Sequence, residues 1–146
     1  MVDVSSEITI NRPVEEVSAY AADPDHAPAW YQNISSVEWV SAPPLALGSR
    51  VRFVAHFLGR TLTYTYEVVE REPGTRLVMR TAEGPFPMET TYTWSPRGEA
   101  ATHMTLRNRG EPRGFAKVGA PLMATAMRRA NTKDLARLKD ILEAGA

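Results

Sequence analysis

Cysteine is absent from the 146 residues of the sequence, which excludes disulfide bonds and thiolate metal sites. This lack suits a reducing compartment, so we expect a cytoplasmic protein. The opening residues MVDVSSEITI contain neither a basic region nor a long apolar run, and we expect no signal peptide. No apolar run approaches the ~20 residues that a membrane span needs. Integral membrane association is therefore not expected.

An excess of either charge is also missing, because 17 basic residues balance 17 acidic ones. Nucleic-acid-binding proteins usually carry a basic excess or a basic stripe. The one dense basic patch, RNRGEPRG at residues 107–114, includes a glutamate and is interpreted as a solvated loop. We expect no nucleic-acid partner.

Motifs for metals, cofactors and nucleophilic catalysis are missing as well. His26, His56 and His103 are expected in a loop and on two outward faces, without HxxxH or His-carboxylate spacing. The sequence has no GxSxG, P-loop or GxGxxG, and its glycines mark turns. We expect neither a metal nor a cofactor. No buried carboxylate pair or His-carboxylate dyad is readable, so the catalytic residues of any activity stay unknown.

Alternating apolar and polar residues predict six or seven antiparallel strands. In TLTYTYEVVE, residues 61–70, one face carries Leu62, Tyr64, Tyr66 and Val68. Buried tyrosine hydroxyls need hydrogen-bond partners. The face therefore looks either onto a packed interior, with each hydroxyl satisfied by its neighbours, or into a cavity that holds a ligand.

This strand and the preceding one are separated by the dipeptide GR at 59–60, which predicts a two-residue hairpin with a type II′ turn. The resulting register places Phe53 opposite Tyr66 and Arg52 opposite Glu67. All pairs on the Phe53 face are then apolar or aromatic, and pattern and turn agree.

The C-terminal part changes to a helical period. Apolar residues and one asparagine recur at steps of three and four, on one arc of roughly 120°: Met123, Met127, Asn131, Leu135, Leu138 and Leu142. They predict a long amphipathic helix that starts near Pro121, with Asp134 near the edge of the arc. Asn131, the polar residue central to this stripe, could bind a ligand carbonyl or make a structural bond to the sheet.

The predicted elements follow a distinctive order: one strand, two short helices, a run of strands and a long helix. This order, together with local sequence motifs, resembles that of a known family. RPVEEVSAYAADPDHAPAWYQNI resembles the opening of the polyketide cyclase/dehydrase and START-like (SRPBCC, Bet v 1-like) superfamily. There a strand leads into Pro-x-x-x-Val, an Asp at the helix end and Pro-x-Trp, which are here Pro13, Val17, Asp23, Pro28 and Trp30. The later segments LGSRVRF, EVVEREPGTRLVMRT, YTWSPRGEAATHMTL and DLARLKDILE are similar too.

The resemblance implies an α+β helix-grip fold, in which a curved antiparallel sheet wraps the C-terminal helix, as a single domain over residues 1–146. It also implies a hydrophobic cavity between the sheet and that helix. We expect the ligand-binding residues to be the large inward side chains and one amide: Trp30, Phe53, Phe57, Tyr64, Tyr66, Met79, Met88, Tyr92, Met104, Met123, Met127 and Asn131. Trp30 either gates the cavity or simply packs, and TAEGPFPME at 81–89 is either a lid or a rigid hairpin loop.

The main functional hypothesis is the binding of a small hydrophobic molecule, such as a lipid, an isoprenoid or a polyketide. The fold alone does not decide function, so two alternatives stay open. One is a cofactor-free polyketide cyclase or dehydratase, which needs a positioned acid or base. The other is a protein-interaction module similar to the chaperone activators of the superfamily. A homodimer is also left open.

Overall fold

The computed structural model describes residues 1–111 and 119–145. The helices and strands follow the predicted order, with seven strands. They are β1 (Val2–Ile10), α1 (Val14–Ala22), η1 (Pro24–His26), α2 (Ala27–Trp30), β2 (Ile34–Trp39), β3 (Arg50–Phe57), β4 (Arg60–Glu72), β5 (Arg76–Glu83), β6 (Met88–Pro96), β7 (Thr102–Gly110) and α3 (Ala120–Glu143).

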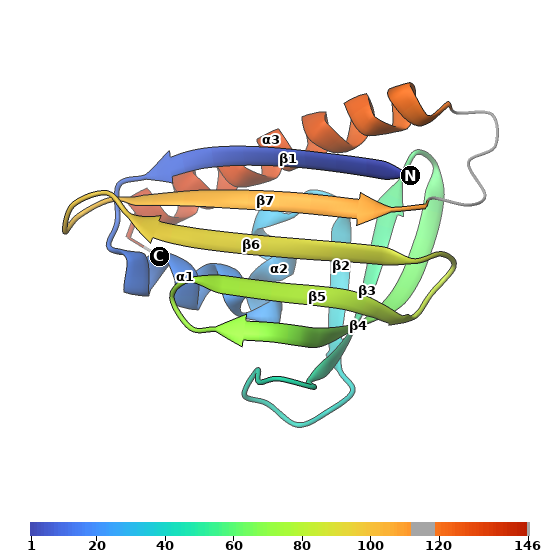
Figure 1. The fold of residues 1–146 in the computed structure, drawn as a ribbon, viewed down its shortest axis with the longest axis horizontal. Helices are drawn as coiled ribbons and strands as arrows, with labels where there is room; N and C mark the ends of the chain where they lie inside the picture. Colours follow the sequence, from blue (N-terminus) through green and yellow to red (C-terminus); the bar gives the residue numbers. More distant parts are fainter. Residues whose placement is uncertain (112–118, 146) are drawn as a thin grey trace.

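The strands form one antiparallel sheet in the order β1-β7-β6-β5-β4-β3-β2. The chain thus begins at one edge, crosses to the other edge through α1 and α2, and returns strand by strand until β7 pairs with β1. The sheet bends strongly, and all the helices lie on its concave side, with α3 running along β1 and β7 (Figure 1). The α+β helix-grip architecture predicted from the sequence is confirmed.

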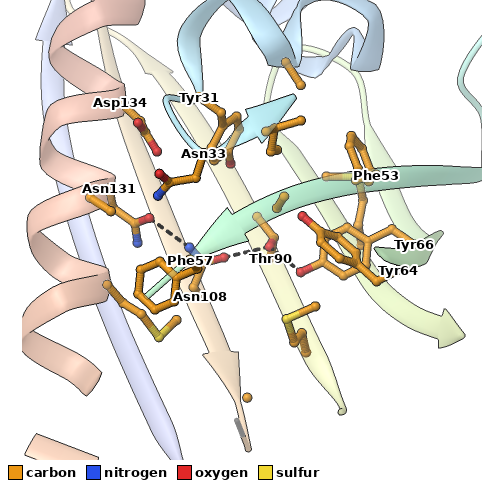
Figure 2. A pocket seen from close by; sticks show the side chains of 18 of the residues that line it. Tyr31, Asn33, Phe53, Phe57, Tyr64, Tyr66, Thr90, Asn108, Asn131 and Asp134 are labelled. Atoms are coloured by element: carbon orange, nitrogen blue, oxygen red, sulfur yellow. Dashed lines mark hydrogen bonds between the residues drawn. The ribbon is translucent and has the colours of Figure 1, made fainter. Parts of the chain in front are cut away.

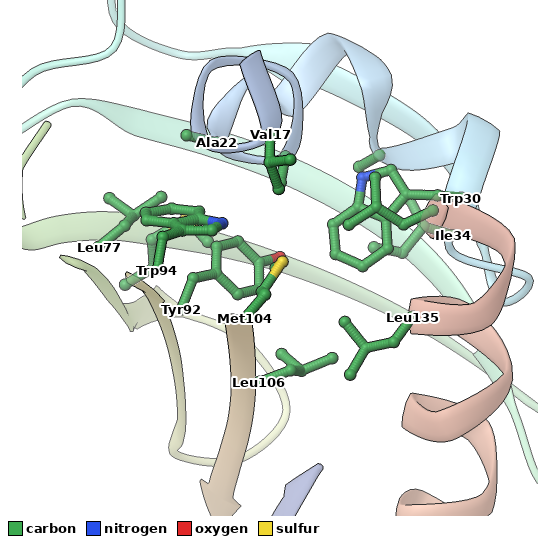
Figure 3. Packing of buried hydrophobic residues seen from close by; sticks show 14 of the residues in the cluster. Val17, Ala22, Trp30, Ile34, Leu77, Tyr92, Trp94, Met104, Leu106 and Leu135 are labelled. Carbon is green, nitrogen blue, oxygen red and sulfur yellow. The ribbon is translucent and has the colours of Figure 1, made fainter. Parts of the chain in front are cut away.

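The main hydrophobic core lies between α1, α2, the second half of α3 and the sheet (Figure 3). Trp30 is fully buried there at the end of the short helices, which agrees with the packing alternative for this residue. A second, smaller cluster of buried residues lies near the start of α3 and consists of Val2, Val4, Leu62, Phe86 and Met123. The two clusters flank the site described below.

The β3–β4 hairpin differs from its predicted register. Phe53 pairs with Tyr64 rather than with Tyr66, and Arg50 rather than Arg52 pairs with Glu67. The prediction was wrong by two residues. Because side chains alternate with a period of two, an even shift keeps every side chain on its predicted face.

The shift arises at the turn, which is formed by Leu58 and Gly59 instead of Gly59 and Arg60. Both turn residues have positive φ, 48° for Leu58 and 78° for Gly59, which is the conformation of a type I′ turn. A leucine is unusual at this position, so the sequence favoured the alternative with glycine first. Arg52 instead forms an ion pair with Glu38 of β2, at 3.2 Å.

The basic patch at 107–114 is only partly a loop. Residues 107–110 end strand β7, so the interpretation as a solvated loop was wrong for them. On the exposed side of the sheet Arg107 donates to Asp3 at 2.6 Å, and Arg109 lies 3.7 Å from Glu89. The rest of the patch, residues 112–114, lies outside the described residues.

The left-handed conformation of Leu58 gives a stability prediction. For an L-residue with a branched side chain this region costs about 1–2 kcal/mol, whereas asparagine tolerates it. We expect Leu58→Asn to raise the free energy of unfolding by about 0.5–1 kcal/mol in urea denaturation.

Leu47→Asn is the matched control, because Leu47 is also exposed but has no positive φ. It should change stability by less than about 0.5 kcal/mol. Equal effects of the two substitutions would show that lost surface hydrophobicity, not the turn, is responsible.

Candidate functional site: a cavity between the sheet and the C-terminal helix

A cavity of about 150 Å³ lies between the concave face of the sheet and the first half of α3. Its lining is mainly aromatic and aliphatic, with polar groups contributed both by the sheet and by the side of α3 and α2 (Figure 2). The polar side chains among the lining residues include Tyr31, Asn33, Tyr64, Tyr66, Thr90, Tyr92, Asn108, Asn131 and Asp134.

Ten of the twelve residues predicted to bind a ligand line this cavity. They are Phe53, Phe57, Tyr64, Tyr66, Met79, Met88, Tyr92, Met123, Met127 and Asn131. Trp30 and Met104 do not line it: both are fully buried in the main core. Met104 does face the concave side as its alternation predicts, but it packs there in the same cluster as Leu135 and Leu138. Contact between these ten residues and a ligand remains a prediction.

The two halves of α3 have different roles. Met123, Met127 and Asn131 line the cavity, as their four-residue spacing predicts. Leu138 and Leu142 are fully buried in the main core, so close packing replaces the cavity along the second half of the helix. The space for a guest is therefore confined to the first half.

The loop between β5 and β6 covers part of the cavity. Phe86 at its tip is buried, belongs to the second cluster and lines the cavity. The loop lies close to β4 because of Gly84: a Cβ added there would stand 3.0 Å from the Cβ of Tyr64. Whether this loop opens as a lid stays a prediction.

A chain of hydrogen bonds crosses the cavity wall from β4 to α3 (Figure 2). The hydroxyls of Tyr66 and Thr90 are 2.8 Å apart, and Thr90 donates to Oδ1 of Asn108 at 2.7 Å. Nδ2 of Asn108 donates to Oδ1 of Asn131 at 3.1 Å. The alternative of a structural bond from Asn131 to the sheet is thus correct for its oxygen. Its Nδ2 is buried without a hydrogen-bond partner in the described structure.

The tyrosines of the cavity are neutral phenols. The hydroxyls of Tyr31 and Tyr92 share a hydrogen bond of 2.5 Å. Burial raises the pKa of Tyr66 to about 12, and it also raises the pKa of Tyr31, Tyr64 and Tyr92 well above the ordinary value. These groups can donate a hydrogen bond at neutral pH but do not act as bases.

Asp134 is a buried carboxyl among the residues that line the cavity. Its side chain is 3% exposed, and its Oδ1 accepts a hydrogen bond from the backbone N–H of Gln32 at 3.0 Å. Burial raises the pKa of this carboxyl to about 6, partly offset by that hydrogen bond. The cavity therefore contains a carboxyl that exchanges its proton near neutral pH.

Several of these polar residues were missed from the sequence. Asn108 continues the inward alternation of Met104 and Leu106, which is a signal that could have found it. Asp134 was visible only as a carboxylate at the edge of the apolar arc. Tyr31 and Asn33 carry no such signal, because they lie in the irregular segment after α2.

No group of three or more His, Cys, Asp or Glu side chains within residues 1–111 and 119–145 could hold a metal ion. None of the helices that the structure describes is long and apolar enough to cross a membrane.

Sequence comparison agrees with the fold. Residues 1–143 match the model of a family described as polyketide cyclase / dehydrase and lipid transport. The chain belongs to this family. A comparison with curated proteins finds no match.

Solved structures of similar shape carry different descriptions. The protein TTHA0849 from Thermus thermophilus is 25% identical, the match covers 99% of both chains, and the two superpose with a TM-score of 0.82. The Zhui aromatase/cyclase from Streptomyces sp. R1128 is 17% identical over 97% of this chain and 93% of its own, with a TM-score of 0.78. A START superfamily protein from Mycobacterium smegmatis is 14% identical over 99% of both chains, with a TM-score of 0.83. The last two, being less than 25% identical, show the shared fold alone.

The raised pKa of Asp134 predicts a pH-dependent stability change. The folded-state pKa of about 6 lies above the ordinary value of 3.8, so ionisation disfavours the folded state increasingly as pH rises from about 4 to 6. Asp134→Asn removes this cost while keeping an acceptor for Gln32. We expect the variant to be more stable by about 2–3 kcal/mol at pH 7.5, with the gain disappearing near pH 4.

Urea denaturation across this pH range measures the difference. Asp140→Asn, at an exposed aspartate of the same helix, is the control and should have little effect at any pH. A gain for Asp134→Asn that did not change with pH would contradict the assignment.

Proposed function

We propose that the protein binds a small, mainly apolar molecule in the cavity between α3 and the sheet. The observation that carries the proposal is the cavity itself, since protein interiors are otherwise close-packed. At ~24 cal/mol per Å³, an empty space of this volume costs about 3–4 kcal/mol of stability. A bound guest would supply the van der Waals contacts that the apolar residues around the empty cavity lack.

The volume of the cavity limits the size of the guest that it can hold. A dry apolar cavity of about 150 Å³ is large enough for one benzene-sized ring. An isoprenoid, a lipid chain or a longer polyketide requires side chains to move. Met88 and Met127 are suited to this because methionine is unbranched and adapts to irregular space. The family description, which names polyketides and lipid transport, supports a guest of this class.

A second function, chemistry on the bound guest without a cofactor, is favoured by one observation. Asp134 lines the same cavity and has a pKa of about 6, which suits a general acid or base near neutral pH. The sequence alone showed no positioned acid or base.

If the protein is a cyclase or dehydratase of this kind, Asp134→Asn should lower kcat on a carbonyl-containing substrate about 10²–10⁴-fold with little change in substrate affinity. Steady-state turnover together with equilibrium binding separates the two parameters. Parallel losses of affinity and turnover, or no loss at all, would exclude this role for Asp134 and leave binding as the function.

Met127→Trp tests the binding proposal directly. The indole would occupy space that the guest needs, so toluene binding measured by calorimetry should weaken at least tenfold. The free energy of unfolding should fall by less than about 1 kcal/mol, whereas overpacking a solid core costs about 1–3 kcal/mol.

Leu122→Trp serves as the control, because Leu122 is exposed on the same helix. It should leave toluene binding and stability unchanged. A strong loss of stability in Met127→Trp, together with no toluene binding by the wild type, would show that the interior is packed.

A further inference from the structure

An unused hydrogen-bond donor points into the cavity. Asn131 is 4% exposed and lies among the lining residues, with its side chain directed from α3 into the space before the sheet (Figure 2). Its Oδ1 is occupied by Asn108, but its Nδ2 has no partner in the described part of the chain. Buried polar groups are nearly always hydrogen-bonded, so an unpaired amide nitrogen at a cavity wall calls for a partner.

The hydrogen-bond chain behind Asn131 uses its amide oxygen and leaves its amide nitrogen. Thr90 uses its single hydroxyl hydrogen to donate to Oδ1 of Asn108, so Tyr66 donates to Thr90. Nδ2 of Asn108 in turn donates to Oδ1 of Asn131. Nδ2 of Asn131 is left for the cavity. An amide nitrogen only donates, so the missing partner is an acceptor.

The charges around the cavity favour a neutral acceptor over an anionic one. Asp134 follows Asn131 by three residues, lines the same cavity and is a buried carboxyl. Arg109 is the cationic residue among the described lining residues, but its guanidinium lies on the exposed side of the sheet, 3.8 Å from Asp3 and 3.7 Å from Glu89. A carboxylate guest would therefore meet the like charge of Asp134 without an opposite charge inside the described cavity.

We propose that Asn131 determines the specificity of the cavity by donating, through Nδ2, to the carbonyl oxygen of a neutral guest. The apolar body of that guest, the size of one ring in the present cavity, then lies against Tyr64, Phe53 and Met127. The inference rests on the proposed binding function and adds to it the chemical class of the guest, a neutral carbonyl compound.

Two probes of equal shape isolate the hydrogen bond. Acetophenone carries the carbonyl, and α-methylstyrene replaces its oxygen with a methylene group. The wild type should bind acetophenone about 3–10-fold more tightly, the value of one neutral hydrogen bond. Asn131→Leu should bring the two affinities together. Thr132→Leu, at the neighbouring exposed position of α3, should keep the wild-type preference.

A measurement on the wild type covers the case in which Asn131→Leu does not fold, since that change also removes the acceptor of Asn108. In ¹⁵N-labelled protein, the Asn131 side-chain NH₂ resonances should shift with acetophenone and much less with α-methylstyrene.

The outcomes separate the two proposals. If both probes bind equally to the wild type and the Asn131 NH₂ signals respond equally to both, the cavity binds apolar guests but Asn131 is not the anchor. If neither probe binds, the binding function fails, and the carbonyl anchor fails with it. A preference for acetophenone that survives Asn131→Leu would also overturn the role of Asn131.

Discussion

The packing of the C-terminal half of α3, which carries the buried leucines, against the sheet determines where the cavity can lie. Leu135, Leu138 and Leu142 are buried in the main core with residues of β7 and β6, and they fix the helix at its C-terminal half. The sheet bends away from this contact, helped by two register shifts in β4. A straight helix held at one end of a curved surface leaves a gap at the other. The cavity follows from this geometry, and the side chains around it decide how far the gap is filled.

The polar groups that line this gap differ in whether their hydrogen bonds are satisfied. Tyr66 and Tyr92 have their hydroxyls paired, which offsets the cost of burying them. Nδ2 of Asn131 has no such partner in the described structure. A cavity wall that only packs would gain stability if this amide were replaced by an apolar side chain. The amide is more easily explained by a guest that completes its hydrogen bonds.

The fold and one face of the site could be predicted from the sequence, and the reason is periodicity. The two-residue period assigned Phe53, Tyr64 and Tyr66 to the concave face, and the helical period assigned Met123 and Met127 to the facing wall. Periodicity assigns a residue to a face of the sheet but not to a position along the strand relative to the cavity. Met104 was therefore placed in the cavity although it packs in the core.

Other features depend on the tertiary structure and had no local signal in the sequence. The turn at Leu58 and Gly59 overrides the residue preference of type I′ turns, and the hairpin register moved by two residues. The chain from Tyr66 to Asn131 joins β4, β6, β7 and α3, and only the folded sheet brings its four members together.

The two proposed roles, binding and catalysis, involve two neighbouring residues of α3, Asn131 for the carbonyl hydrogen bond and Asp134 for proton transfer. Asn131 and Asp134 are three residues apart, so they lie on one face of the helix and at the same cavity. A carbonyl oxygen held by Nδ2 of Asn131 is polarised, and the hydrogens on the adjacent carbon become more acidic. If Asp134 as its carboxylate took one of them, the negative charge would move to the oxygen that the amide holds. A guest without such a hydrogen could only be bound. The chemistry of the guest, together with its distance from Asp134, would thus decide between a carrier and a catalyst on the same scaffold.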